Sequence, residues 1–278
     1  MLLLPLLYFY FVQIPNAEGL FDFSFGRQKI CICRCGIQRP AVDRLFGGEA
    51  VSSNQYPWLA VVNAGSTSFS GSLVSDRHIV TAASPLYGLP SNNVSVILGV
   101  RDRCGLGSAP VNGVESVIIH PGYSPTTSDN DIALVRMNHP ISFDNHISPI
   151  CLPLSGSQRA GSVATVASWG NYSEDSSCVP KVASLPILES QTCLTGAVNN
   201  SLVTVDKGCL GPAGTTSVIC SEDVGAPVMT QWIRGYQFRL SGLISSTSCQ
   251  EQTTPLFTRV YEHTAWIRRL IASDCQCF

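Results

Sequence analysis

Short runs of β-branched and apolar residues recur along the chain and are broken by turn residues about every ten positions, as is typical of all-β proteins. We expect strands at residues 58–62, 72–82, 94–100, 114–119, 132–137, 162–169, 182–188, 226–231, 238–245 and 256–260. Asn112-Gly113 predicts a hairpin turn, residues 190–195 predict a helical turn, and apolar residues at helical spacing predict a helix over residues 261–272. The pattern therefore predicts an all-β barrel or sandwich that ends in one helix.

The composition suits a folded domain with a sizeable core. Hydrophobic residues make up 45% of the 278 residues, which is ample for such a core. Charged residues make up 13%, with 17 Lys and Arg against 19 Asp and Glu. Because the charges balance, nothing global would attract nucleic acid or an anionic membrane, and we expect neither as a partner.

The N-terminal residues and the cysteines both indicate an extracellular protein. Residues 1–17 form an apolar run that becomes small and polar at its end, which predicts a secretory signal peptide. The alternative, a transmembrane anchor, would need an apolar run of ~20 residues, and neither this segment nor any later one provides it. Twelve cysteines predict a disulfide framework formed in an oxidising compartment. We therefore expect a secreted protein.

Other short motifs fit a secreted glycoprotein. Asn-x-Ser sequons predict N-linked glycans at Asn93, Asn171 and Asn199. Cys31, Cys33 and Cys35 are too closely spaced to form a folded module, so they predict a tether. A zinc site would require a second pair of Cys or His at a suitable spacing, and none follows. We therefore expect no metal and no cofactor.

Two segments carry the most specific signal in the chain. Residues 220–227 read Cys-Ser-Glu-Asp-Val-Gly-Ala-Pro, and residues 79–85 read Ile-Val-Thr-Ala-Ala-Ser-Pro. They resemble the C-x-G-D-S-G-G-P and (I/V)-(L/V)-T-A-A-H-C signatures of the trypsin/chymotrypsin (S1) family of serine proteases. Further segments resemble that family in the same order, at residues 129–134, 164–170, 258–260 and 266–267. The resemblance covers about residues 44–272 and implies two six-stranded antiparallel β-barrels followed by a C-terminal α-helix.

The resemblance places other residues at the catalytic positions of the family. Val224 stands where the family has its serine nucleophile, and Ser84 stands where it has its histidine base, whereas Asp131 matches the aspartate of the triad. Valine offers no nucleophile and serine offers no base, and attack on a carbonyl needs both. Glu222 matches an oxyanion-hole glycine and places a carboxylate where negative charge would develop. We expect Asp131 to be held by backbone and hydroxyl donors, including Ser84.

No histidine is expected to replace the missing base. His78 lies on the same predicted strand as Ser84, about 20 Å away at ~3.3 Å per residue. The remaining histidines match positions that the family does not use for catalysis, namely His120, His139, His146 and His263.

The substrate pocket implied by the resemblance is altered as well. Val218 matches the aspartate at the pocket floor of trypsin-like enzymes, so selection of Lys or Arg by charge pairing is lost. Ser245-Ser246-Thr247 replaces a substrate-facing Ser-Trp-Gly run, and Pro255 replaces a glycine of the pocket wall. Because such glycines let a side chain pass, the added bulk should narrow or close the pocket.

Residues 44–48, Arg-Leu-Phe-Gly-Gly, resemble the activation site of the family. Cleavage after Arg44 would free the amine of Leu45. In the family, this amine pairs with the buried aspartate that precedes the nucleophile, which corresponds here to Asp223. The alternative is a relic site that is never cut.

The resemblance also implies disulfides, namely Cys35–Cys151, Cys193–Cys209, Cys220–Cys249 and Cys104–Cys178. The last pair lies in loops that neighbour each other in the family fold and that certain invertebrate homologues bridge. It would serve as a simple staple or would preorganise a contact loop. Cys31 and Cys33 have the same spacing as Cys275 and Cys277, so we expect these four cysteines to join the two ends of the chain, in a pairing that the sequence leaves open.

These features predict a signal peptide (1–17), a short Cys-rich propeptide (18–44), a trypsin-like serine protease homologue domain (45–272) and a Cys-containing tail (273–278). The resemblance, above all to secreted arthropod members of the family, implies a zymogen-like, inactive homologue. We expect it to act as a non-enzymatic regulator or cofactor in an extracellular proteolytic cascade, with an active protease or its zymogen substrate as partner. The alternatives are a structural or surface-recognition protein of the extracellular matrix or of a secretion and, more remotely, a serine-type endopeptidase.

Overall fold

The computed structural model describes residues 31, 33–39, 55–100, 102–105, 110–154, 160–170, 178–190, 192–193, 204–211, 219–232, 236–246 and 254–277. The predicted signal peptide, the predicted cleavage site at Arg44 and Leu45, and the sequons at Asn171 and Asn199 lie outside these residues. Among the described residues, no helix has the length and apolar character needed to cross a membrane.

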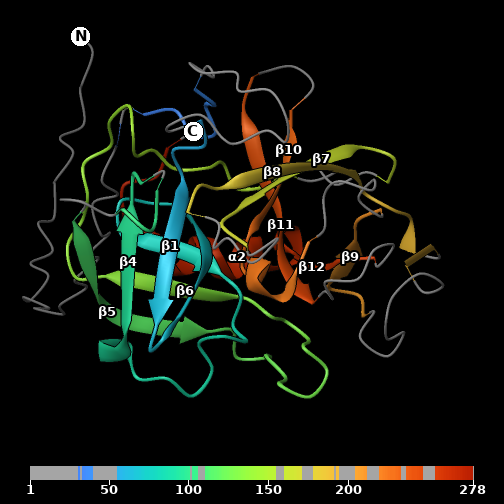
Figure 1. Cartoon of the computed structure of the whole chain (residues 1–278), viewed down its shortest axis with the longest axis horizontal. Coiled ribbons are helices and arrows are strands. Elements are labelled where there is room, and N and C mark those ends of the chain that lie inside the picture. Colours follow the sequence, from blue (N-terminus) through green and yellow to red (C-terminus); the bar gives the residue numbers. More distant parts are fainter. Residues whose placement is uncertain are drawn as a thin grey trace, which may run out of the picture.

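The first half of the chain forms a closed antiparallel barrel with the strand order β1-β2-β3-β6-β5-β4 (Figure 1). Its strands are β1 (Leu59–Ala64), β2 (Thr67–Leu73), β3 (His78–Thr81), β4 (Val94–Leu98), β5 (Val111–Ile119) and β6 (Ala133–Met137). Branched side chains such as Val62, Val96 and Leu134 are fully buried in the core of the barrel. Burial of these side chains favours the barrel, and its closure removes the open strand edges on which other chains could pair.

The second half forms a six-stranded antiparallel sheet with the order β8-β7-β10-β11-β12-β9. Its strands are β7 (Val163–Ser168), β8 (Lys181–Pro186), β9 (Lys207–Cys209), β10 (Pro227–Gln231), β11 (Phe238–Ser246) and β12 (Leu256–Arg259). The two edge strands meet just beyond their ends, where Ile187 bridges Leu210 and the Gly211 N–H donates to Pro186 O at 2.7 Å. The sheet therefore curls into a second barrel-like unit.

Two glycines shape the core of this second unit around one aromatic ring. Phe257 in β12 is fully buried, and a Cβ at Gly208 or Gly242 would collide with its ring. Glycine at these strand positions gives up side-chain packing but lets the neighbouring strands approach the ring closely.

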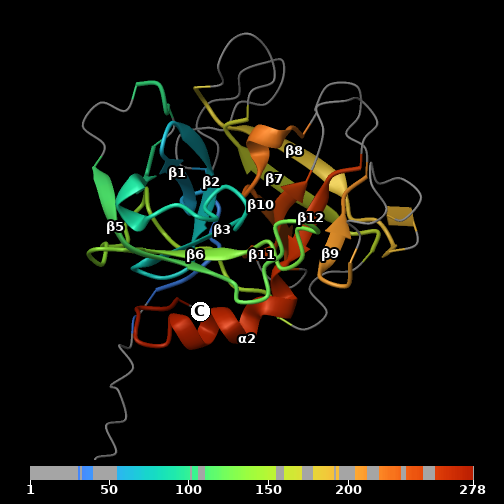
Figure 2. The ribbon, with the colours of Figure 1, turned by 90° about the horizontal axis from the view of Figure 1, so that it is seen from below.

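The chain ends in α2 (Val260–Leu270), which Figure 2 shows below the strands β6 and β11. Val260, Trp266 and Ile267 are its main buried apolar side chains, and they belong to the same core cluster as the first barrel. Arg268 and Arg269 lie in its last turn, where positive charge is favourable because of the helix dipole.

The predicted all-β architecture with a C-terminal helix is confirmed, but two local expectations are wrong and one strand was missed. The run at 72–82 is two strands, because the Ser75 hydroxyl accepts the N–H groups of Arg77 and His78 and turns the chain between β2 and β3. Asn112-Gly113 lies within β5 rather than in a hairpin turn. The short strand β9 was not predicted.

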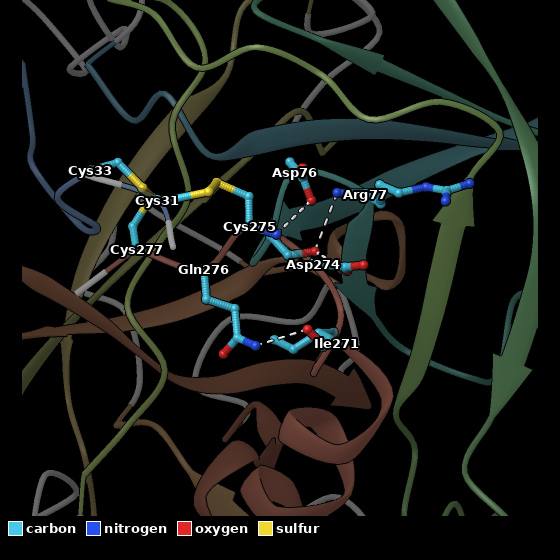
Figure 3. Close-up of a disulfide and its surroundings, with 10 residues drawn as sticks. Cys31, Cys33, Asp76, Arg77, Ile271, Asp274, Cys275, Gln276 and Cys277 are labelled. Atoms are coloured by element: carbon cyan, nitrogen blue, oxygen red, sulfur yellow. Dashed lines mark hydrogen bonds between the residues drawn. A yellow bond between two sulfur atoms is a disulfide. The ribbon is translucent and has the colours of Figure 1, made fainter. Parts of the chain in front are cut away.

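Two disulfides, Cys31–Cys275 and Cys33–Cys277, join the two ends of the chain (Figure 3). We call these four cysteines the terminal clasp. The cysteines therefore pair in order, which settles the connectivity that the sequence left open.

Hydrogen bonds hold the C-terminal side of the terminal clasp against the first barrel. Asp274 accepts from Ser75 Oγ at 2.7 Å and pairs with His78 Nδ1, and both of these partners are buried. The Cys275 N–H donates to Asp76 Oδ1 at 3.0 Å (Figure 3). His78 is therefore the first residue of β3, and its side chain pairs with Asp274 beside the terminal clasp rather than with the site at Ser84.

Removing both bridges of the terminal clasp should cost more stability than the two separate removals added together. Each bridge joins cysteines that are 244 residues apart, so either one alone keeps the ends of the unfolded chain together. In the chain-entropy model, closing a loop of a hundred residues or more contributes roughly 5 kcal/mol, and the second bridge adds only a short loop. Urea unfolding of Cys31→Ser/Cys275→Ser, of Cys33→Ser/Cys277→Ser and of the fourfold variant measures this. Additive losses would contradict it.

The helix α2 buries His263 against a second histidine. The rings of His263 and His120 have centroids 4.8 Å apart, and the Trp266 ring lies 5.0 Å from that of His120. Burial, together with the neighbouring His120, lowers the pKa of His263 to about 4. The folded protein therefore keeps this imidazole neutral at mildly acidic pH.

Stability should fall as the pH falls from about 6.5 to about 4, because the unfolded chain binds a proton at His263 that the folded chain excludes. The loss attributable to this group should approach about 3 kcal/mol at the lower end of the window. His263→Phe keeps a ring against His120 and should flatten the profile. Urea unfolding across this pH range compares the two proteins, and equal slopes would rule out His263 as the source.

Candidate functional site

The residues that correspond to the catalytic positions come together because two strands of the first barrel pair. Strands β3 and β6 are antiparallel neighbours, and Thr81 near the end of β3 lies opposite Ala133 at the start of β6. Ser84 follows β3, and Asp131 lies just before β6, so the strand register places these two side chains beside each other.

Asp131 is fully buried and is held by three donors. Its Oδ1 accepts the Ser84 N–H at 2.7 Å, and its Oδ2 accepts the Ser84 hydroxyl at 3.2 Å and the Ser245 hydroxyl at 2.6 Å. Such donors satisfy a carboxylate that water does not reach. The Ser84 hydroxyl therefore occupies the side of Asp131 on which the family resemblance would place an imidazole.

Val224 follows the 3₁₀ turn η3 (Ser221–Asp223), which lies against β2 in the first barrel. Gly225 has φ +83°, and a Cβ there would collide with Thr81 Oγ1 and with the Ser70 carbonyl. Only glycine fits this close approach, which holds η3 and Val224 beside the end of β3. At this place Val224 offers an isopropyl group and no atom that could attack a carbonyl.

The exposed Glu222 lies in the same turn and accepts a hydrogen bond from the hydroxyl of its neighbour Ser221 at 3.2 Å. Its carboxylate would repel negative charge that develops on a substrate oxygen at this place.

None of the five histidines, all of which are described, lies in contact with Asp131. His78 pairs with Asp274, and His120 stacks on His263, whereas His139 and His146 are exposed in loops. The described site thus combines a carboxylate, a hydroxyl and a hydrocarbon group.

Asp223 is buried at the end of η3 and has partners within the described chain. Its Oδ2 accepts the Cys220 N–H at 2.7 Å, its Oδ1 accepts the Ser168 hydroxyl, and the backbone of Gly170 packs against the carboxylate. Ser168 stands where the matching family strand, A-x-V-x-G-W-G, has a glycine. This departure from the family pattern was the sequence signal that could have revealed the contact. Because Leu45 lies outside the described residues, its pairing with Asp223 stays a prediction.

Sequence analysis also missed a lysine behind Asp131. Lys207 in β9 is buried, and its Nζ donates to Ser245 Oγ and to Thr258 Oγ1, both at 2.8 Å. Burial lowers the pKa of Lys207, whereas the charge of Asp131 raises it. No strand was predicted around Lys207, so nothing in the sequence indicated that its side chain points inward.

Two tyrosines, the exposed Tyr87 and the half-buried Tyr123, form an aromatic pair beside the site. Tyr87, three residues after Ser84, is 57% exposed, and its ring centroid lies 5.3 Å from that of Tyr123. Burial and the charge of Asp131 raise the pKa of Tyr123 to about 12, so this phenol stays neutral at physiological pH. The loop that carries Ser84 therefore also presents an aromatic surface to solvent.

The remaining predicted residues are placed only in part. Val218, Thr247 and Cys249 lie outside the described residues, Ser246 lies in β11, and Pro255 is buried. Disulfides join Cys35 to Cys151, Cys104 to Cys178 and Cys193 to Cys209, and Cys220 is also disulfide-bonded. Asn93 is exposed at the end of η1 (Ser91–Asn93), where a glycan could be attached.

Comparisons with known proteins agree with this architecture. The model of the family described as Trypsin matches residues 45–267. Transmembrane protease serine 9 of Rattus norvegicus is 32% identical over 268 residues, which cover 94% of this chain and 25% of that protein. The chain therefore spans a quarter of the length of this relative.

Two insect relatives match over most of their own length. Phenoloxidase-activating factor 3 of Holotrichia diomphalia is 30% identical over 261 residues, which cover 84% of this chain and 74% of that protein. CLIP domain-containing serine protease B4 of Anopheles gambiae is 30% identical over 262 residues, which cover 84% of this chain and 71% of that protein. Together with the two six-stranded units and the C-terminal helix, these matches show that the chain belongs to the trypsin (S1) family of serine proteases.

Proposed function

We propose that this protein is a secreted, catalytically inactive member of the trypsin family that acts as a non-enzymatic regulator or cofactor in an extracellular proteolytic cascade. The observation that carries the proposal is the combination of Val224, Ser84 and Asp131. The fold keeps the buried aspartate, while the nucleophile and the base are replaced by groups that can perform neither task.

The size of the expected loss supports inactivity. In a serine protease, removal of the serine or of the histidine lowers turnover by on the order of 10⁶-fold, and what remains depends largely on the oxyanion hole. Here the Ser84 hydroxyl is engaged with Asp131, and Glu222 puts a carboxylate near the place where an oxyanion would form. Both changes act in the same direction.

The disulfides and the relatives support an extracellular, regulatory role. Disulfides persist in oxidising compartments, and the structure holds five of them among its described residues. One relative is named as a phenoloxidase-activating factor, and this name supports a role in the activation of another protein. The expected partner is accordingly an active protease or its zymogen substrate.

We also propose that the chain is cut after Arg44 and that the pieces stay together. Cys31, Cys33 and Cys35 lie before the cleavage site, and each is bonded to a cysteine after it. The backbone supports this attachment, because the Gly36 N–H donates to Pro149 O at 2.8 Å and the Phe238 N–H donates to Gly36 O at 2.7 Å. The N-terminal segment would therefore remain part of the regulator in both forms.

A crosslinking pull-down beside an activity-probe lane tests the proposed role. The intact protein and the protein cut after Arg44 would be captured from the extracellular fluid of the source, and partners would be identified by mass spectrometry. A fluorophosphonate probe should leave this chain unlabelled, because valine rather than serine stands at position 224, whereas trypsin in the same lane serves as the positive control. We expect recovery of a protease or its zymogen.

Other outcomes of the same experiment would change the assignment. Recovery of only matrix or carbohydrate material would favour a structural or recognition protein. Labelling of this chain by the probe would favour the alternative hypothesis that the protein is a serine endopeptidase.

Restoring the two catalytic side chains should yield little activity. In Val224→Ser/Ser84→His, Glu222 still opposes an oxyanion, so we expect hydrolysis of peptide esters at least ~10³-fold slower than by a trypsin-like enzyme. The matched variant that also carries Glu222→Gly should be faster than the double variant. Rapid turnover by the double variant itself would show that the oxyanion position is intact.

A further inference from the structure

Lys207 is a buried cation directly behind the candidate site. The residue is 3% exposed, and its Nζ donates to the hydroxyl oxygens of Ser245 and Thr258. Asp206 Oδ2 lies 3.9 Å from Nζ, beyond hydrogen-bond distance. Removing an ammonium group from water is costly, so a lysine at this depth needs negative charge nearby and hydrogen-bond acceptors for its protons.

The Ser245 hydroxyl connects this cation to Asp131. Its oxygen accepts from Lys207 Nζ at 2.8 Å, and its hydrogen is donated to Asp131 Oδ2 at 2.6 Å. The two charges are thus two hydrogen bonds apart, in an interior where attraction between charges is screened much less than in water. The charge of Lys207 also contributes to the lowered pKa of His263.

Asp131 has its remaining contacts on the side that faces solvent. The Ser84 N–H and hydroxyl both donate to its carboxylate, and Ser84 itself is exposed. A chain of polar contacts therefore runs from Lys207 through Ser245 and Asp131 to Ser84 at the surface.

We propose that Lys207 is the internal counter-ion of Asp131, and that this bridged pair positions Ser84 and its loop. The compensating charge lies inside the second barrel, whereas a catalytic imidazole would stand on the solvent side of the carboxylate. An imidazole placed at position 84 would meet a carboxylate whose charge is already balanced, and it would gain little proton affinity from it. Lys207 is thus a third determinant of the chemistry of this site, and the pairing is independent of the proposed cascade role.

A double-mutant cycle measures the pairing. Lys207→Met leaves the Asp131 charge without its internal cation, and Asp131→Asn leaves Lys207 with Asp206, 3.9 Å from Nζ, so each change should lower the folding equilibrium constant about a hundredfold or more in urea unfolding. The variant with both changes buries neither charge. Its folding equilibrium constant should therefore be at least tenfold higher than the value obtained by adding the free-energy losses of the two single variants. If the single variants fail to fold while the double variant folds, the pairing is supported. A double variant less stable than both single variants overturns it.

The pair Arg77–Glu115, whose side chains are 21% and 46% exposed, provides the control at the surface. Arg77 Nη2 donates to Glu115 Oε2 at 2.7 Å. The cycle of Arg77→Met and Glu115→Gln should show a coupling of only a few fold, because water screens surface pairs. Equal coupling in the two cycles would show that Lys207 and Asp131 interact no more strongly than a surface pair, and would overturn the proposal.

A titration separates charge compensation from a merely structural role. Ser84→His changes an exposed position, and nuclear magnetic resonance can follow the proton of the introduced imidazole. With Lys207 present its pKa should lie near or below the ordinary value of about 6.5, and adding Lys207→Met should raise its proton affinity about tenfold. A pKa well above the ordinary value in the single variant, or no change on adding Lys207→Met, would overturn the assignment of Lys207 as counter-ion.

Discussion

The buried carboxylate of Asp131 constrains the residues around it, because they must supply its hydrogen-bond donors. A charge with no access to water must accept hydrogen bonds from the protein. Asp131 accepts them from Ser84 in the loop after β3 and from Ser245 at the end of β11. Lys207 in β9 contributes indirectly, because it donates to the Ser245 hydroxyl. These segments belong to both halves of the fold. Satisfying one carboxylate therefore helps to fix how the second sheet meets the first barrel, and this need persists whether or not the site performs chemistry.

The stability of this trypsin-family fold does not depend on the side chains at the catalytic positions, because other interactions stabilise it. Apolar side chains fill both barrels, and glycines at 208, 225 and 242 allow close approaches between chain segments that any side chain would prevent. Disulfides at the ends and on the loops restrict the unfolded chain. Replacing an exposed imidazole by Ser84, or a nucleophile by Val224, removes none of these contributions. The fold can thus persist whichever side chains stand at these two positions.

Sequence reasoning reached most of the fold because strands and helices leave periodic signals. The runs of Val, Ile and Leu in β4, β6 and β7 are long enough for alternation to be visible, and the apolar stripe of α2 repeats at helical spacing. The errors arose where one hydroxyl or one neighbour decided the structure. Ser75 splits a continuous β-branched run by accepting two backbone N–H groups, and Asn112-Gly113 stays in a strand because Asn112 Nδ2 donates to Val96 O across the pair.

The sequence by itself determined the fold class and the family, since these depend on local pattern and on motifs in a fixed order, and it predicted which side chains stand at the catalytic positions. The tertiary structure alone decided how the four cysteines of the terminal clasp pair, and that Ser168 contacts Asp223. It also decided that Lys207, Ser245 and Asp131 form one buried network. The physical reason is that these interactions join residues far apart in the chain, and their strength depends on burial, which a linear sequence does not specify.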